Sequence, residues 1–215
     1  TLDEAEDAML ALTAQRARLV DGQDVLELGC GWGSLTLWMG EHFPRSRITA
    51  VSNSKPQREH IEREARRRRI DNVTVITRDM NSFEADAQFD CVVSVEMFEH
   101  MRNYQTLLNR ISKWMKPEAK LFVHIFCHRY VMYPFETDGD DNWMGKYFFT
   151  GGIMPSADTL LHFQQDMSIQ QRWLLSGEHY EKTSNHWLAN QDANREEIMQ
   201  IMKSTYGEKD AKRWF

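Results

Sequence analysis

Short apolar runs alternate with longer amphipathic or charged runs over the first 125 residues of the chain. The apolar runs have the length and the β-branched composition of buried strands, whereas the runs between them show helical spacing. The pattern predicts strands over residues 24–28, 47–51, 73–76, 89–95 and 120–125, and helices over residues 3–19, 33–42, 55–69 and 103–115. This alternation predicts an α/β fold with a doubly wound, mainly parallel Rossmann-like sheet and ligands at the carboxyl ends of its strands.

The alternation stops after the fifth predicted strand. Residues 127–165 are rich in aromatic side chains and glycine, and we expect them to form an inserted cap with short helices over the strand ends. A sixth strand is predicted over residues 168–175, and a further helix over residues 179–202.

The length of the chain limits how many domains it can form. A chain of 215 residues suffices for one α/β domain with a sizeable core and is short for two. We therefore expect a single domain over residues 1–215, with a cofactor half over residues 1–126 and a cap and substrate region over residues 127–215.

Composition and charge exclude several classes of partner. No apolar run approaches the roughly 20 residues of a membrane span, so no integral membrane contact is expected. The net charge of −6 argues against a nucleic-acid partner, and the arginines at residues 66–69 are more simply a solvated helix end. Three cysteines without a C-x-x-C pair, and an N-terminus without a targeting pattern, favour buried reduced thiols and a cytoplasmic protein. A homodimer is compatible with these features, and no metal site is predicted.

A glycine-rich loop follows the first predicted strand and carries the sequence Glu-Leu-Gly-Cys-Gly-Trp-Gly over residues 27–33. Its glycines allow positive φ and a close approach of the backbone to a small ligand, and the helix that follows directs N–H groups at it. A dinucleotide site would need a glycine at Ser34 and an acidic residue after the second strand, and both are missing. The loop therefore predicts a cofactor other than nicotinamide or flavin, with an ordinary tight turn as the alternative.

A cluster of titratable residues follows the fourth predicted strand. Glu96, Glu99 and His100 lie within five residues, and His124 ends the fifth strand at the same edge of the sheet. Such groups are costly to bury unless they act on a ligand, which favours an active site. The alternative is structural, with Glu99 or His100 capping the next helix and His124 hydrogen-bonded in the core.

Several stretches of the chain together resemble one family of enzymes. These stretches are residues 27–33, 51–57, 96–101, 122–128 and 147–157. They are similar to the plant alkaloid N-methyltransferases of the coclaurine N-methyltransferase group, which belong with the cyclopropane-fatty-acid synthases. The resemblance implies a class I methyltransferase fold that binds S-adenosylmethionine. It implies cofactor contacts by Glu27, Gly29, Gly31, Gly33, Ser52, Asn53, Gln57, Asp79 and Met80.

The resemblance also implies the reaction, which is methyl transfer to the nitrogen of a small aromatic or alkaloid-like amine. It assigns catalysis to Glu96, Glu99 and His100. This assignment agrees with the chemistry, because an amine is protonated at neutral pH and a carboxylate beside an imidazole can bind the cation and accept its proton. The residues expected to bind the substrate are His124, Tyr130, Phe135, Trp143, Tyr147 and Phe148.

Two other functions stay open at this point. The cyclopropane synthases have a glycine in place of Glu96 and use bicarbonate with a histidine that matches His124, and such an enzyme would act on unsaturated acyl chains. A protein that binds the cofactor without catalysis is the third class. The family extends further at both ends, so we expect an N-terminal lid and C-terminal strands to be absent from this chain.

Overall fold

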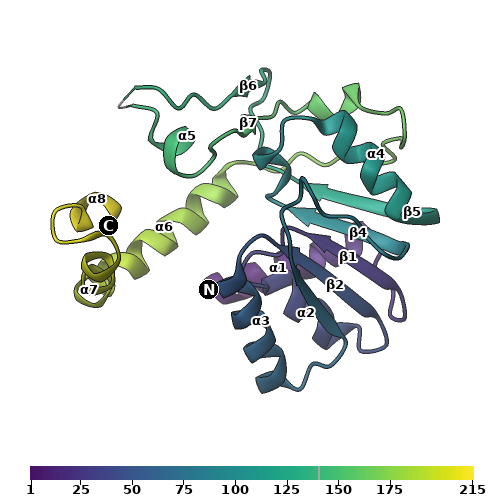
Figure 1. Ribbon diagram of the computed structural model, residues 1–215, viewed down its shortest axis with the longest axis horizontal. Helices are drawn as coiled ribbons and strands as arrows, with labels where there is room; N and C mark the ends of the chain where they lie inside the picture. Colours follow the sequence, from purple (N-terminus) through teal and green to yellow (C-terminus); the bar gives the residue numbers. More distant parts are fainter. Residues whose placement is uncertain (140) are drawn as a thin grey trace. The chain divides into compact units, whose positions relative to one another are not determined.

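The structure is a computed structural model, and it describes residues 1–139 and 141–215. The chain forms two compact units (Figure 1). We call residues 7–171 the sheet unit, and residues 1–6 together with 172–215 the tail unit. The expectation of one domain with halves at residues 1–126 and 127–215 stays a prediction.

The sheet unit contains a parallel sheet of five strands in the order β3-β2-β1-β4-β5. The strands are β1 (Asp24–Leu28), β2 (Arg47–Ser52), β3 (Val73–Thr77), β4 (Phe89–Val95) and β5 (Met115–His124). The order reverses direction at β1, so β1 and β4 lie side by side at the topological switch point where such sheets bind ligands. The predicted α/β class and all five of its predicted strands are confirmed.

Helices cover both faces of this sheet (Figure 1). They are α1 (Leu2–Ala17), α2 (Ser34–His42), α3 (Lys55–Arg68) and α4 (Tyr104–Trp114). On one face, Met39 of α2 packs in a cluster with Val25 and Ile48 of the sheet. On the other face, Ile111 of α4 packs with Leu26. The apolar side chains that alternate along each strand thus find a helix on either side, as a doubly wound fold requires.

Strand β5 begins earlier than predicted. It starts at Met115, which pairs with Phe89, and the register then shifts before Lys120 pairs with Cys91. The intervening residues form an irregularity in which Glu118 has a φ of 64°. A bulge tolerates Pro117 because its missing N–H is not needed by the ladder, which explains how the strand passes through a proline.

The amino ends of three strands are joined by charged side chains. Lys116 Nζ donates to Asp24 Oδ2 at 2.9 Å and to Asp90 Oδ2 at 2.8 Å. Arg47 pairs with Asp24 as well, at 2.6 Å. The Lys116 ammonium holds the pKa of Asp90 below its usual range. We call Lys116, Asp24 and Asp90 the basal clamp, and it lies at the edge of the sheet opposite to the carboxyl ends.

The predicted cap is built partly of strands. Its elements are β6 (Tyr133–Pro134), α5 (Trp143–Tyr147), β7 (Ile153–Met154) and the 3-10 turn η2 (Thr159–His162). Strands β6 and β7 pair antiparallel, so the expectation of short helices was only partly right. The segment packs on η1 (Phe98–His100), since a Cβ built on Gly152 would lie 2.3 Å from the carbonyl oxygen of Glu99.

The prediction for the last part of the chain needs two corrections. Residues 168–175 form no strand, and their large side chains are exposed, Leu174 by 69%. A strand requires a neighbour to pair with, and these residues belong to neither of the sheets in the described part of the chain. The predicted helix over 179–202 is two helices that meet at Asn194. The helices are α6 (Glu178–Ala193) and α7 (Arg195–Tyr206), followed by α8 (Ala211–Trp214).

None of the helices in the described residues is long and apolar enough to cross a membrane. Of the cysteines, Cys30 and Cys91 are buried and free, whereas Cys127 is exposed, contrary to the expectation of buried thiols.

Candidate functional site

The loop after β1 owes its shape to its three glycines. Gly29, Gly31 and Gly33 all have positive φ, at 82°, 53° and 89°. A Cβ on Gly29 would lie 2.6 Å from Met97 Cγ, and one on Gly33 would lie 2.5 Å from Ile61 Cγ1. A Cβ on Gly31 would meet nothing within 4 Å. Two glycines are thus required by packing, and the third faces open space where a ligand can reach the backbone.

The same loop is anchored from behind. The N–H groups of Gly29 and Cys30 both donate to the carbonyl oxygen of Val51, each at 3.0 Å. The N–H groups of Gly31 and Trp32 have no hydrogen-bond partner within the described residues. Those two donors sit just before α2, where a polar or anionic ligand group is favoured.

Glu27, the last but one residue of β1, lies beneath this loop. Its side chain is buried and accepts a hydrogen bond from the Thr36 hydroxyl of α2. Burial raises the pKa of the Glu27 carboxyl to about 7, and the hydrogen bond from Thr36 opposes this shift. A cationic ligand group next to the loop would favour the ionised form.

The other predicted cofactor residues lie at the ends of β2 and β3. Ser52 is buried and donates from Oγ to Gln57 Oε1 at 2.6 Å, whereas Asn53 is exposed. After β3, Asp79 is exposed and Met80 is half-buried. All nine predicted cofactor residues therefore lie on or just after the carboxyl ends of three adjacent strands.

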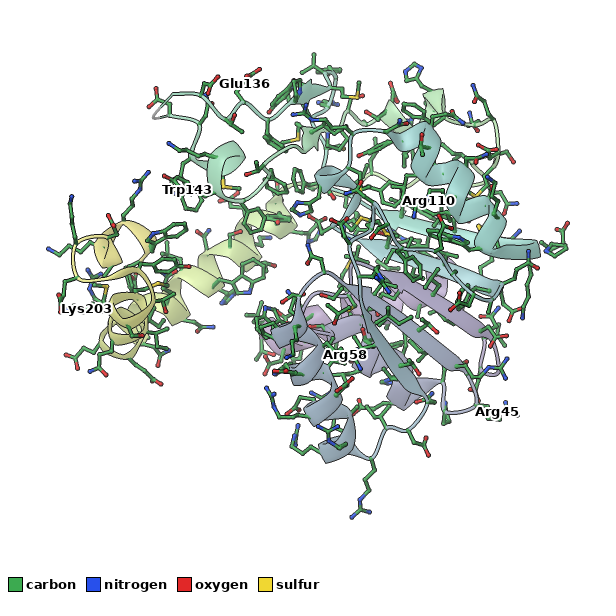
Figure 2. The ribbon with its side chains drawn as sticks, in the orientation of Figure 1. Arg45, Arg58, Arg110, Glu136, Trp143 and Lys203 are labelled. Carbon is green, nitrogen blue, oxygen red and sulfur yellow. The ribbon has the colours of Figure 1, made fainter. Side chains whose placement is uncertain are left out.

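Arg110 of α4, labelled in Figure 2, braces the turn after β3. Its guanidinium donates to the carbonyl oxygens of Met80, at 2.9 Å, and of Phe83. Asp79 is engaged in the same turn, because Asn81 donates from N and Nδ2 to its Oδ1. The turn is thus held in place by the helix on the α4 face of the sheet.

Glu96 lies directly after β4 in a strained conformation. Its φ is 54°, a value that a residue with a side chain rarely adopts, and its N–H donates to the carbonyl oxygen of His124 at 2.9 Å. Glu96 Oε1 lies 3.8 Å from His124 Nε2. Its side chain is 30% exposed, and partial burial raises its pKa to about 7. Glu96 is therefore a carboxylate that solvent and ligands can reach and that titrates near neutrality.

Glu99 differs from Glu96 in burial. It has no exposed surface, and its Oε1 accepts the Phe126 N–H at 2.8 Å. Its Oε2 is buried without a hydrogen-bond partner among the residues that the structure describes. Burial, and next the charge of Glu96, raise the pKa of Glu99 to about 8. The two carboxyl groups thus have unlike surroundings although they are three residues apart.

The two histidines of the site are both neutral near pH 7. Burial, and next the charge of Arg16, lower the pKa of His124, whose Nδ1 is buried and unpaired among the described residues. Partial burial lowers the pKa of His100. The His100 ring stacks on Phe149 with centroids 4.9 Å apart. A neutral imidazole keeps a nitrogen that can accept a proton.

Aromatic side chains of the cap contact His100 directly, Phe149 at 4.9 Å and Phe148 at 6.0 Å between ring centroids. Phe149 stacks on Phe135 at 4.7 Å and contacts Phe148 at 4.7 Å and Phe126 at 5.3 Å. Two of the predicted substrate residues, Phe135 and Phe148, therefore belong to one cluster with the imidazole.

The remaining predicted aromatic residues lie elsewhere in the cap. Tyr130 is 76% exposed and its ring lies 6.5 Å from that of His128. Trp143, labelled in Figure 2, and Tyr147 are both on α5 and pack on each other at 5.8 Å.

Sequence reasoning missed Phe149, Phe126 and Met97. Phe149 stands in an aromatic run, but nothing in that run indicates which ring is buried. Phe126 contributes a backbone N–H, which leaves no trace in residue identity. Among the described residues, no group of histidine, cysteine, aspartate and glutamate side chains could hold a metal ion.

The sequence matches the family described as mycolic acid cyclopropane synthetase over residues 1–214. It is 43% identical over 210 residues to (S)-coclaurine N-methyltransferase from Thalictrum flavum subsp. glaucum, a match that covers 97% of this chain and 58% of that relative. It is 42% identical over 214 residues to the enzyme of the same name from Papaver somniferum, covering 98% and 61%.

A solved structure matches as well. It is the crystal structure of coclaurine N-methyltransferase bound to N-methylheliamine and SAH, with a TM-score of 0.92 and 43% identity. The match covers 98% of this chain and 62% of that one. The chain thus spans about three fifths of the length of the relatives that it matches.

Proposed function

The chain belongs to the mycolic acid cyclopropane synthetase family, and we propose that it is an S-adenosylmethionine-dependent methyltransferase acting on an amine nitrogen. The substrate class is a small aromatic or alkaloid-like amine. The fold of the chain is that of the class I methyltransferases. The observation that carries the proposal is the pair Glu96 and His124 at 3.8 Å, beside the carboxyl edge where the glycine loop leaves β1.

The residues at that edge fit S-adenosylmethionine. The open face of Gly31 and the N–H groups of Gly31 and Trp32 suit the amino-acid part of the cofactor, and Glu27 suits its cationic amine. When bound, the cofactor supplies an electrophilic methyl group. The residues that would hold it are Glu27, Gly29, Gly31, Gly33, Ser52, Asn53, Gln57, Asp79 and Met80.

The protein's own part in the reaction is to prepare the amine. An alkyl amine has a pKa near 10, so it arrives as an ammonium without a free electron pair. The half-buried Glu96 carboxylate attracts this cation and takes its proton, while His124 and His100 stay neutral acceptors beside it. General-base help of this kind contributes roughly 10² to 10⁴ in rate. We propose that Glu96, Glu99 and His100 form the catalytic site, in which Glu96 is the group that accepts the proton.

Aromatic side chains would hold the ring of the substrate. Phe135, Phe148 and Phe149 form a surface next to His100, and a ring system packed there keeps its nitrogen close to the carboxylates. Aromatic faces also stabilise the cationic form of the amine by roughly 0.5 to 2 kcal/mol. Tyr130, Trp143 and Tyr147 complete the proposed substrate-binding set.

Methyl transfer from labelled S-adenosylmethionine to a panel of aromatic amines tests the proposal. The wild type is compared with Glu96→Gln and His100→Ala, and we expect each variant to lose about 100-fold or more in rate. Glu136→Gln is the matched control, because Glu136 is an exposed cap carboxylate with no assigned role (Figure 2). Full rates in both site variants would contradict the assignment.

The alternative is methyl or methylene transfer to unsaturated acyl chains. The family description itself favours this second candidate. Incubation with vesicles of unsaturated phospholipid distinguishes the two. A mass gain on the acyl chains together with no product from any amine would replace the amine proposal by the lipid one.

A further inference from the structure

We infer that Glu99 is a positioning residue, which ties η1 to the chain after β5 and leaves Glu96 as the carboxylate that meets the amine. This inference rests on the proposed function and divides the work of its two carboxyl groups. The two residues stand three positions apart in one short segment, so their different surroundings are what separates them.

Exposure is the first observation. The Glu99 side chain has no exposed surface, whereas that of Glu96 is 30% exposed. A group without exposed surface cannot touch a substrate in this conformation of the site. It can still affect the reaction by keeping neighbouring groups in position.

The hydrogen bond of Glu99 is the second observation. Its Oε1 accepts the N–H of Phe126, the second residue after β5, at 2.8 Å. This bond joins the segment after β4 to the segment after β5 at the edge where both leave the sheet. An unpaired N–H buried there would cost about 1 to 3 kcal/mol, so the carboxyl group has a structural reason to be present.

The neighbours of this bond explain how it reaches the reacting groups. The Phe126 ring contacts Phe149 at 5.3 Å, and Phe149 stacks on His100 at 4.9 Å. Gly152 of the cap lies directly against the carbonyl oxygen of Glu99. The hydrogen bond therefore closes a ring of contacts that runs from Glu99 through Phe126 and Phe149 to His100, and it fixes the direction of the imidazole.

Glutamine separates the two roles that Glu99 could have. Its amide oxygen can accept the Phe126 N–H as Oε1 does, and it has the same shape as the carboxyl group. An amide cannot accept a proton near neutral pH. A positioning role therefore survives Glu99→Gln, and a proton-accepting role does not.

The experiment compares glutamine with alanine at both positions. Methyl transfer is measured for Glu99→Gln, Glu99→Ala, Glu96→Gln and Glu96→Ala, and hydrogen exchange of the Phe126 N–H is followed by NMR. We expect Glu99→Gln to be at least about tenfold faster than Glu99→Ala, whereas the two Glu96 variants are equally slow. The Phe126 N–H should exchange slowly in Glu99→Gln and in both Glu96 variants, and fast in Glu99→Ala.

Two results would overturn the inference. The first is a Glu99→Gln variant as slow as Glu99→Ala while its Phe126 N–H stays protected, because Glu99 would then take part in the chemistry. The second is a protected Phe126 N–H in Glu99→Ala, because the hydrogen bond would then hold nothing. A wild type that methylates no amine contradicts the proposed function instead, and the exchange comparison still decides the positioning role.

Discussion

The loop after β1 and the segment after β4 leave the sheet side by side, yet they hold their shapes by different means. The loop places glycine at each of its left-handed positions, Gly29, Gly31 and Gly33. The segment places Glu96 in such a conformation and buries Glu99. The loop is therefore relaxed and its shape follows from residue type, whereas the segment is strained and its shape is imposed by packing.

The difference shows where each part can be altered. A cofactor loop of glycines offers its backbone to the ligand, so whether a glycine can be replaced depends on the space into which the new side chain would project. A carboxylate segment offers side chains, and their pKa values depend on the burial that surrounding elements impose. Substitutions can therefore disturb the backbone of the loop or the burial of the carboxylates, one without the other.

The largest effect is expected from adding a Cβ behind the loop. Gly29→Ala combines a positive φ with a contact of 2.6 Å to Met97 and should lower the free energy of unfolding by about 3 kcal/mol. Gly31→Ala adds only the backbone strain and should lower it by about 1 kcal/mol. Urea unfolding measures both.

Gly31→Ala should lose little folding stability but much of its affinity for SAH, because its added Cβ points into the open face of the loop. Calorimetric titration with SAH checks this. Equal losses of stability in the two variants would contradict the packing difference between these glycines.

The pH dependence of stability should be the next largest effect. The folded pKa of Glu27 is about 7 and the ordinary value is 4.5, so the folded state binds the extra proton between these values. Stability is then highest below pH 4.5 for this group and falls as the pH rises through 7, by about 3 kcal/mol in all.

Glu27→Gln should remove this contribution and make the decline of stability between pH 5 and pH 8 shallower, while the contributions of Glu96 and Glu99 remain. Thermal unfolding at a series of pH values measures it. Glu136→Gln serves as the control, since Glu136 is exposed. A Glu27→Gln curve parallel to that of the wild type would contradict the raised pKa.

A smaller effect is expected in the pH profile of the reaction. Glu96 has a pKa of about 7 and must be ionised to accept a proton, so kcat/KM should fall about tenfold per pH unit below 7. Glu99, His100 and His124 surround it and shift the midpoint. Glu96→Gln should be slow, and its kcat/KM should not fall in this way below pH 7. If the fall persists in Glu96→Gln, another group is responsible for the titration.

The smallest effect concerns the strain at Glu96. Glycine adopts its φ of 54° freely, so Glu96→Gly should keep or raise the free energy of unfolding, by up to about 1 kcal/mol, while it abolishes the proposed base. Glu136→Gly should lower stability by about 0.5 to 1 kcal/mol, because Glu136 has no positive φ to relieve. Chemical unfolding compares the two, and a clear loss in Glu96→Gly would mean that its side chain stabilises the fold.

The central strands could be predicted to the residue because they are buried on both faces. Strands β1 and β4 appear in the sequence as short, mainly apolar runs, and both have the bounds that the sequence predicted. Strand β5 was predicted too short, since its bulge around Pro117 depends on pairing with β4. The prediction of a strand over residues 168–175 was wrong for the same reason, because a strand forms only where another strand can pair with it.

The site was predictable in its residue types and less so in their roles. Glu96 and Glu99 have the same chemical identity, and only their surroundings in the folded chain leave Glu96 partly exposed and bury Glu99. The contribution of Phe126 is a backbone N–H, to which the sequence gives no clue. The roles of the predicted site residues stay predictions until the variants are measured.

The basal clamp has a consequence for engineering. Lys116 binds Asp24 and Asp90 at the amino edge, so three strands are fastened together at the end of the sheet that carries no proposed function. Residues of the cap can therefore be randomised in a library selected for new amines while the clamp is left untouched. The stability that the clamp gives to the members of such a library should fall as the salt concentration rises, because partly exposed ion pairs weaken with ionic strength.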